Sequence, residues 1–109
     1  MILPDLLGGL ASLAFEPFRD GVEIAWLRRD PDGGPAAALL RYQPGARSPR
    51  HRHAGWEHVF VLSGDQSDAQ GTLRPGGLAA NPPGSERQVV SAEGCVALLV
   101  WERQPIMLE

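Results

Sequence analysis

Glycine and proline interrupt this chain at intervals too short for a long helix. The 109 residues include 13 glycines and 10 prolines, about a fifth of the chain, where a typical domain has roughly 12%. They gather in clusters at residues 31–35, 75–77 and 82–84, and such clusters are strong turn signals. The pieces between the turns have the length of strands, so we expect an all-β chain.

The expected strands are the apolar and β-branched runs between these turns. Residues 22–27 and 36–42 flank the first cluster and predict a hairpin. Further strands are expected at residues 51–53, 57–62, 72–74, 78–80, 88–90 and 95–101. Strands at this spacing favour an antiparallel barrel or sandwich. The preceding residues 1–21 mix leucines with glycine and proline, which predicts an arm with at most one helical turn.

Composition excludes several other classes of protein. With 43% hydrophobic and 21% charged residues, the chain should form one domain with a buried core, neither disordered nor a disulfide scaffold. A net charge of −3 argues against a nucleic-acid partner. The single cysteine, Cys95, cannot form an intrachain disulfide. No apolar run is long enough for a membrane span, and residues 1–13 lack a basic start, so we expect a cytoplasmic protein without a membrane partner.

Two histidines and a glutamate follow Gly45 at short intervals. His51 and His53 are two residues apart, and alternate side chains of a strand share a face, so both imidazoles should point to one side. Residues 54–56 could turn the chain and bring Glu57 to the same place. Two imidazoles and a carboxylate with open positions suit non-haem iron, and also zinc or manganese. We therefore predict that His51, His53 and Glu57 bind a divalent ion, Fe, Zn or Mn.

The run that starts at Glu57 is expected to bury both of its faces. Alternation places His58, Phe60 and Leu62 opposite Glu57, so His58 is not expected among the ligands. Apolar residues on both faces of one strand predict contact with a second sheet, and we expect a homodimer.

The spacing Gly45-x5-His51-x-His53-x3-Glu57-x6-Gly64 agrees with every fixed position of the first motif of the cupin superfamily, and the chain resembles a cupin. A second cupin motif is matched in part within residues 76–84. Further phrases resemble the ChrR branch, whose members include the cupin domain of zinc-dependent anti-sigma factors. These phrases lie at residues 41–45, 61–64, 81–85 and 91–95.

The resemblance implies an all-β fold, a single antiparallel cupin barrel, also described as a double-stranded β-helix or jelly roll. We expect this domain at residues 22–109, after a short N-terminal arm at residues 1–21. The resemblance also implies a metal site but no single activity, since the branch contains anti-sigma cupins and small cupins similar to dioxygenases. The helical sigma-binding domain of the anti-sigma factors is not recognisable in this sequence, so a sigma factor is not an expected partner.

Arg87 stands where the resemblance places a fourth ligand histidine. A guanidinium stays protonated and offers no lone pair, so it cannot replace an imidazole as a ligand. It could pair with Glu57 and leave the barrel without metal, or swing outward and leave three ligands and water. It could equally bind the anionic group of a substrate.

Two functions agree with these residues. The first is a metal-binding cupin, a dioxygenase or isomerase acting on a small anionic molecule, with Arg87 as a substrate-binding residue. The alternative is a non-catalytic, ligand-sensing or regulatory cupin with a degenerate metal site. The sequence does not say whether the protein is an enzyme, and it indicates no catalytic residue.

Overall fold

The structure is a computed structural model and describes residues 1–108. Within them the only helical element is the 3₁₀ turn η1, and all other elements are strands. The bounds are η1 (Leu10–Ser12), β1 (Glu16–Arg19), β2 (Val22–Arg29), β3 (Ala36–Tyr42), β4 (His51–Arg52), β5 (Glu57–Gly64), β6 (Gln66–Asp68), β7 (Gly71–Leu73), β8 (Leu78–Asn81), β9 (Glu86–Arg87), β10 (Cys95–Trp101) and β11 (Ile106–Met107). The prediction of an all-β chain is confirmed.

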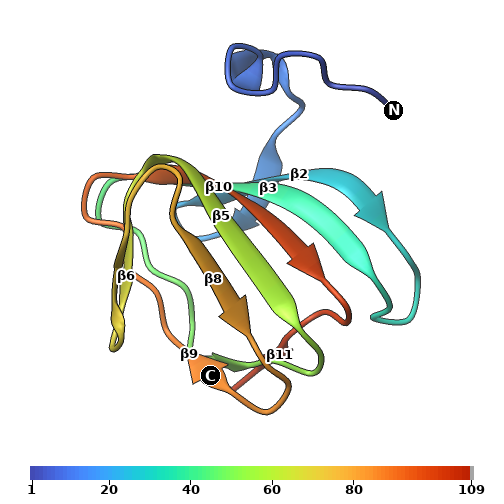
Figure 1. Cartoon of the computed structure of the whole chain (residues 1–109), viewed down its shortest axis with the longest axis vertical. Coiled ribbons are helices and arrows are strands. Elements are labelled where there is room, and N and C mark those ends of the chain that lie inside the picture. The colour runs from blue at the N-terminus through green and yellow to red at the C-terminus, as the bar shows by residue number, and fades with distance from the viewer. Residues whose placement is uncertain (109) are drawn as a thin grey trace.

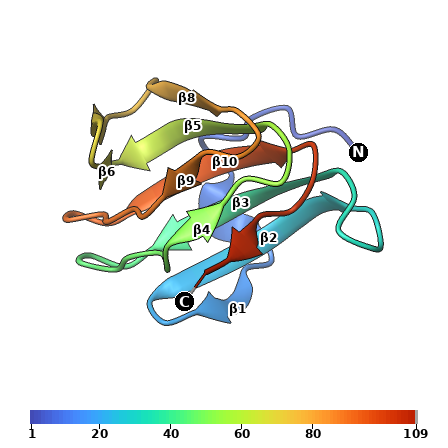
Figure 2. The same ribbon diagram turned by 90° about the horizontal axis from the view of Figure 1, so that it is seen from below.

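The strands form one large sheet, one small sheet and a hairpin. The large sheet has the order β1-β2-β3-β10-β5-β8, the small sheet β11-β4-β9, and β6 pairs with β7. Every pairing is antiparallel. The small sheet lies across one face of the large sheet, as Figures 1 and 2 show from two sides. This is the layout of a jelly roll, although strand pairing does not close it into a continuous barrel.

Several expected strands are present and others are displaced. The hairpin of β2 and β3 forms as predicted, with Val22 opposite Tyr42. The strand expected at residues 88–90 lies earlier, at β9, while Val90 makes only isolated bridges to Arg47 and Ser67. Local composition did not indicate β1 or β6. Their positions depend on partners distant in sequence.

The predicted boundary between an arm at residues 1–21 and a domain at residues 22–109 stays a prediction. In the structure, β1 lies within the expected arm and pairs with β2, with Glu16 opposite Ile24. The arm is therefore joined to the large sheet by a strand. Glu109, the last residue of the expected domain, lies outside the described residues.

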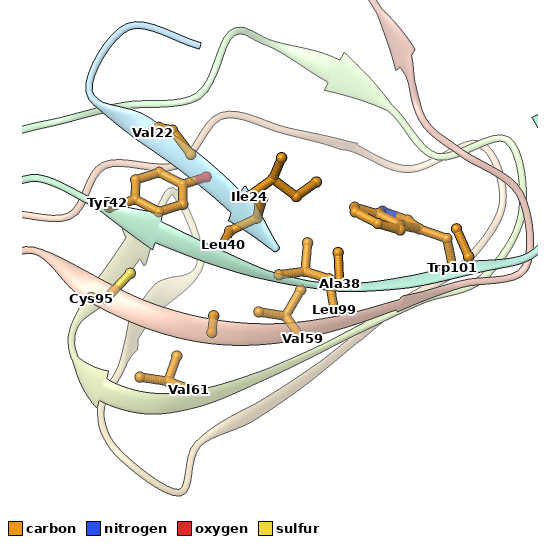
Figure 3. Close-up of a cluster of buried hydrophobic side chains, with 12 residues drawn as sticks. Val22, Ile24, Ala38, Leu40, Tyr42, Val59, Val61, Cys95, Leu99 and Trp101 are labelled. Atoms are coloured by element: carbon orange, nitrogen blue, oxygen red, sulfur yellow. The ribbon is translucent and has the colours of Figure 1, made fainter. Parts of the chain in front are cut away.

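The core lies between the two sheets and follows from the two-residue period of the strands. Val59 and Val61 point inward from β5, and Ala97, Leu99 and Trp101 point inward from β10. Figure 3 shows these side chains meeting those of β2 and β3 on one side of the large sheet. Burial of apolar area at about 25 cal/mol per Å² makes this cluster the main source of stability.

The opposite face of the large sheet is apolar as well, and the arm covers part of it. Leu6, Leu10, Leu13 and Phe15 of the arm pack against a second cluster on this outer face. The sheet residues of that cluster are Ala25, Leu27, Leu39, Leu62, Val96 and Leu98. The arm lies on the side of the large sheet away from the small sheet (Figure 2). The jelly roll therefore has apolar residues on both faces of its main sheet.

Gly64 should tolerate no side chain, because its backbone is close to the next strand. Its φ is +72°, and a Cβ atom there would lie 1.8 Å from the carbonyl oxygen of Gly94. We predict that Gly64→Ala lowers the free energy of unfolding by more than ~3 kcal/mol, since steric overlap adds to the backbone strain. Urea denaturation measures this change.

Gly33→Ala is the matched control. Gly33 has a similar φ of +71°, and a Cβ atom there would have no neighbour within 4 Å. Gly33→Ala should therefore lower the free energy of unfolding only by the ~1–2 kcal/mol that backbone strain costs. Equal losses in the two variants would contradict the steric argument.

Candidate metal centre

His51, His53 and Glu57 come together in the structure. All three are buried, and one potential ligand atom from each lies within 4.8 Å of the others. His51 belongs to β4 of the small sheet, His53 follows it directly, and Glu57 begins β5 of the large sheet. The cluster therefore lies where the two sheets meet and has the composition of a metal site.

The hydrogen bonding of His51 leaves one of its nitrogens free for a ligand bond. Nδ1 of His51 lies 2.9 Å from the carbonyl oxygen of Pro49, which can only accept, so Nδ1 carries the proton. Burial lowers the pKa of His51, and this effect outweighs the opposing effect of the Pro49 hydrogen bond. The imidazole is thus neutral at pH 7, and its Nε2 has a lone pair.

His53 is oriented by a short chain of hydrogen bonds. Its Nδ1 lies 2.9 Å from Oγ of Ser85, and that hydroxyl donates to the carbonyl oxygen of Pro82 at 2.6 Å. Because the serine proton is already used, Nδ1 of His53 must donate to Ser85. Nε2 of His53 then faces Oε1 of Glu57 at 3.2 Å.

Glu57 is held between its two neighbours in the large sheet. Asn81 and Trp101 lie opposite Glu57 on β8 and β10. Nδ2 of Asn81 donates to Oε1 at 3.2 Å, and the indole Nε1 of Trp101 donates to Oε2. Burial alone would raise the pKa of Glu57. The opposing effects of His53, His51 and Trp101 together outweigh burial, so the pKa is lowered from its ordinary value. The carboxylate therefore stays ionised.

The contact between His53 and Glu57 needs either a proton or a metal ion. If Nε2 of His53 carried no proton, its lone pair would face a carboxylate oxygen at 3.2 Å, and two acceptors at that distance repel. A proton on Nε2 satisfies the pair, and so does a divalent ion shared with Nε2 of His51. The hydrogen bonds that His51 donates to Pro49 and His53 donates to Ser85 are of the kind that orient ligating imidazoles in metal sites.

Arg87 faces the same region but is paired with Asp68. It lies directly opposite His51 across β4 and β9, is buried, and its Nε donates to Oδ2 of Asp68. From the sequence, Arg87 was expected either to pair with Glu57 or to swing outward. In the structure it is buried and pairs with Asp68. Asp68 neutralises the guanidinium, which lessens its repulsion of a cation at the histidines.

A cavity of about 270 Å³ opens beside the cluster. Its polar lining includes His51, Glu57 and Arg87, and also Arg19, Arg29, Ser48, Gln66 and Gln104. Aromatic side chains form much of the rest: Phe18, Trp26, Tyr42 and Trp101. Burial raises the pKa of Tyr42, so its hydroxyl keeps its proton. The site thus combines a metal-type cluster, the guanidinium groups of three arginines and an aromatic wall.

Sequence reasoning found three residues of this cluster and missed their partners. His58 faces away from it and is exposed, as expected. Ser85, Asn81 and Trp101 contact the cluster through register between distant strands, which no local pattern reveals. Asp68 was also missed, because the β6–β7 hairpin that carries it meets Arg87 only in the folded chain.

Comparison with known proteins identifies the family. The profile of the family described as "ChrR Cupin-like domain" matches residues 5–105, so this chain belongs to the ChrR-like cupins. No curated protein matches the sequence. The predicted family and cupin fold are confirmed.

Solved structures share this fold. In a complex of SigE with the anti-sigma factor ChrR from Rhodobacter sphaeroides, 89% of this chain aligns at 26% identity and a TM-score of 0.78, over 54% of that chain. An RmlC-like cupin from Ralstonia eutropha aligns with 89% of this chain at 20% identity and a TM-score of 0.76, over 66% of its own length. An acetylacetone dioxygenase from Acinetobacter johnsonii aligns with 87% at 15% identity and a TM-score of 0.79, over 72% of its length.

This chain thus spans about half to two thirds of the first two of these proteins. At identities of 20% and 15%, the second and third structures support the fold alone. Among the described residues, no helix has the length and apolar character needed to cross a membrane.

The Arg87–Asp68 pair should make stability depend on pH in acid. Burial would raise the pKa of Asp68, but the Arg87 hydrogen bond and the N–H groups of Gln70 and Gly71 outweigh it, so the pKa is lowered from 3.8. A carboxyl with a lowered folded-state pKa stabilises the fold above its unfolded pKa and loses this effect as pH falls through the folded value. We predict that Asp68→Asn costs about 2–3 kcal/mol at pH 7.

The difference between wild type and Asp68→Asn should shrink as the pH is lowered from about 5 towards 2. Urea denaturation at several pH values measures it. Asp20→Asn, which changes an exposed carboxylate, is the control for the loss of one negative charge. A difference that stays constant with pH would contradict the assignment.

Proposed function

We propose that this protein is a metal-binding cupin whose cavity binds a small anionic molecule. The carrying observation is that three buried side chains, His51, His53 and Glu57, bring one potential ligand atom each to within 4.8 Å of the others. A bound Fe, Zn or Mn ion would supply Lewis acidity, and Fe(II) would also supply the redox chemistry of a dioxygenase. A cytoplasmic location belongs to this proposal and rests on the sequence.

Arg87 supports an anionic ligand. One edge of its guanidinium is used by Asp68, and the residue also lines the cavity, so further N–H donors are available to a carboxylate. We infer that Arg87 positions the charged group of a substrate beside the histidines. In this role it orients the substrate and does not contact the ion.

The mouth of the cavity also favours anions with a flat apolar body. The guanidinium of Arg29 lies 4.3 Å above the ring of Trp26, and that of Arg19 lies 4.6 Å above the ring of Phe18. Trp26 in turn packs against Trp101, with ring centroids 6.0 Å apart. Two positive groups over aromatic rings would attract an anion and then hold its apolar part. A small aromatic acid has this combination.

Tyr42 and Trp101 would help to orient a ligand in the cavity. The hydroxyl of Tyr42 keeps its proton and can donate to an oxygen of the ligand, as a neutral phenol does. Trp101 fixes Glu57 and contributes its ring to the cavity. If the protein is an enzyme, these residues would orient the substrate while the ion polarises it, in a dioxygenase or isomerase reaction.

The alternative is a non-catalytic ligand sensor, and one observation favours it. The Arg87–Asp68 ion pair places a guanidinium where a fourth ligand histidine is expected, and so fewer ligands than usual remain. In that case the imidazolium form of His53 pairs with Glu57, and the cavity binds its anion without metal. The two functions differ in whether the purified protein holds an ion.

Metal content decides between them. We predict that protein purified without chelators or metal-affinity steps contains about one equivalent of Fe, Zn or Mn by elemental analysis. His51→Ala should weaken metal binding by about a hundredfold or more, because it removes one of three ligands. His58→Ala is the matched control, since this exposed histidine faces away and its loss should leave the metal content unchanged.

Absence of metal even after incubation with Fe(II), Zn(II) and Mn(II) would overturn the metal proposal and leave the sensor. Equal loss of metal in His51→Ala and His58→Ala would show that the cluster is not the site.

The anion role of Arg87 predicts selectivity between two molecules of the same shape. Benzoate should bind more tightly than the neutral benzamide. Arg87→Gln should raise the Kd of benzoate by about 10–100-fold and leave the Kd of benzamide unchanged. Titration calorimetry measures both. Because Arg87→Gln leaves Asp68 without its partner, the double variant Arg87→Gln/Asp68→Asn is the folding control and should show the same loss. Benzoate binding that is unaffected by both variants would exclude Arg87 as the anion site.

A further inference from the structure

Gln66 carries a buried side-chain atom that has no hydrogen-bond partner. Within residues 1–108, Oε1 of Gln66 is the only buried side-chain nitrogen or oxygen of this kind. The residue is 2% exposed and lines the cavity beside the metal-type cluster. A buried acceptor without a donor destabilises the folded chain and is rare in native proteins. We therefore looked for the donor that this oxygen would take.

The two branches of the Gln66 amide differ in their neighbours. The amide is hydrogen-bonded to the thiol of Cys95, and this bond opposes burial, which raises the pKa of that thiol. A hydrogen bond lowers the pKa of a thiol only when an N–H donates it, because it then favours the thiolate, so Nε2 of Gln66 faces Cys95. Cys95 is not part of the cavity lining. The branch that remains for the cavity is Oε1.

Tyr42 supplies a donor at the same end of the cavity. It lies opposite Cys95 across β3 and β10, is buried and lines the cavity as Gln66 does. Figure 3 shows its hydroxyl on the inner side of the large sheet, directed towards Ile24. This hydroxyl keeps its proton, since burial raises the pKa of Tyr42, and it makes no hydrogen bond to another residue within the described chain.

One hydroxyl group of a ligand would satisfy both residues. A hydroxyl donates one hydrogen bond and has two lone pairs, so it can donate to Oε1 of Gln66 and accept from Tyr42. A carboxylate has no proton for Gln66, and an amide N–H has no lone pair for Tyr42. An ordered water molecule would also fit, and the experiment below separates it from a ligand.

We propose that Gln66 and Tyr42 select a hydroxy acid, whose hydroxyl donates to Oε1 of Gln66 and accepts from Tyr42 while Arg87 holds its carboxylate. This proposal rests on the proposed function and names the class of anion that the same cavity takes. The last torsion of a glutamine side chain is soft, so a small rotation brings the buried Oε1 to the ligand. Gln66 is then a specificity-determining residue, because a ligand without the hydroxyl leaves two buried polar groups unpaired.

Titration calorimetry on the protein purified without chelators tests this selectivity. The probes are the ortho, meta and para isomers of hydroxybenzoate and of fluorobenzoate. Fluorine is close to a hydroxyl group in size but brings no proton. At one ring position or more, the hydroxy compound should bind about tenfold more tightly than its fluoro counterpart, because its hydroxyl pairs with two buried groups.

Gln66→Met keeps the length of the side chain and removes the acceptor. The Kd of the favoured hydroxybenzoate should rise about tenfold in this variant, and the Kd of the matching fluorobenzoate should not change. Tyr42→Phe should reduce the same preference several-fold. Gln43→Met is the matched control, since Gln43 is exposed and lies outside the cavity lining, and it should keep the full preference. Circular dichroism checks that each variant is folded.

Failure of this inference and failure of the proposed function give different results. Equal Kd values for the hydroxy and fluoro compounds at every position would overturn the inference and assign the pair to water, with the anion site unaffected. A preference that persists in Gln66→Met would place the hydroxyl elsewhere, on the ion for example, and also overturn it. If no compound of either series binds, the proposed anion site fails as well. If Gln66→Met does not fold, the two series on wild type and Tyr42→Phe give the same decision.

Discussion

The two-residue period of β5 organises most of this molecule. Glu57, Val59 and Val61 point to the inside, where the first belongs to the candidate metal centre and the other two to the core. His58 and Phe60 point to the opposite face of the large sheet and are exposed. A slip of one residue would exchange these sets and put a carboxylate on the surface. The site and the core therefore depend on the same register.

Charge pairing explains how the site keeps ionised groups in an apolar interior. Glu57 is buried, yet it receives hydrogen bonds from an amide and an indole and faces an imidazole. Arg87 is buried too, and Asp68 compensates it. Burying an unpaired charge costs several kcal/mol. Hydrogen bonds thus stabilise the Glu57 carboxylate, and Asp68 compensates the charge of Arg87. A ligand anion would share the Arg87 guanidinium with Asp68.

Local patterns in the sequence were enough for the fold class and for the three residues of the cluster. Turn clusters separated the strands, and the spacing of His51, His53 and Glu57 reflects alternation along two neighbouring strands. The contacts that orient these residues could not be predicted, because Ser85, Asn81 and Trp101 are 24 to 44 positions away from the residues they contact. The displacement of β9 and the Asp68 partner of Arg87 have the same cause: pairing between distant segments decides them.

The small sheet supplies two members of the cluster and the large sheet supplies the third. His51 lies in β4 and His53 follows that strand directly, whereas Glu57 lies at the start of β5. An ion bound to all three side chains would link the two layers of the jelly roll. The layers could then separate only if the ion were released. Ion binding and folding stability are then linked. Because the ion binds only the folded chain, filling the site raises the free energy of unfolding of the whole protein.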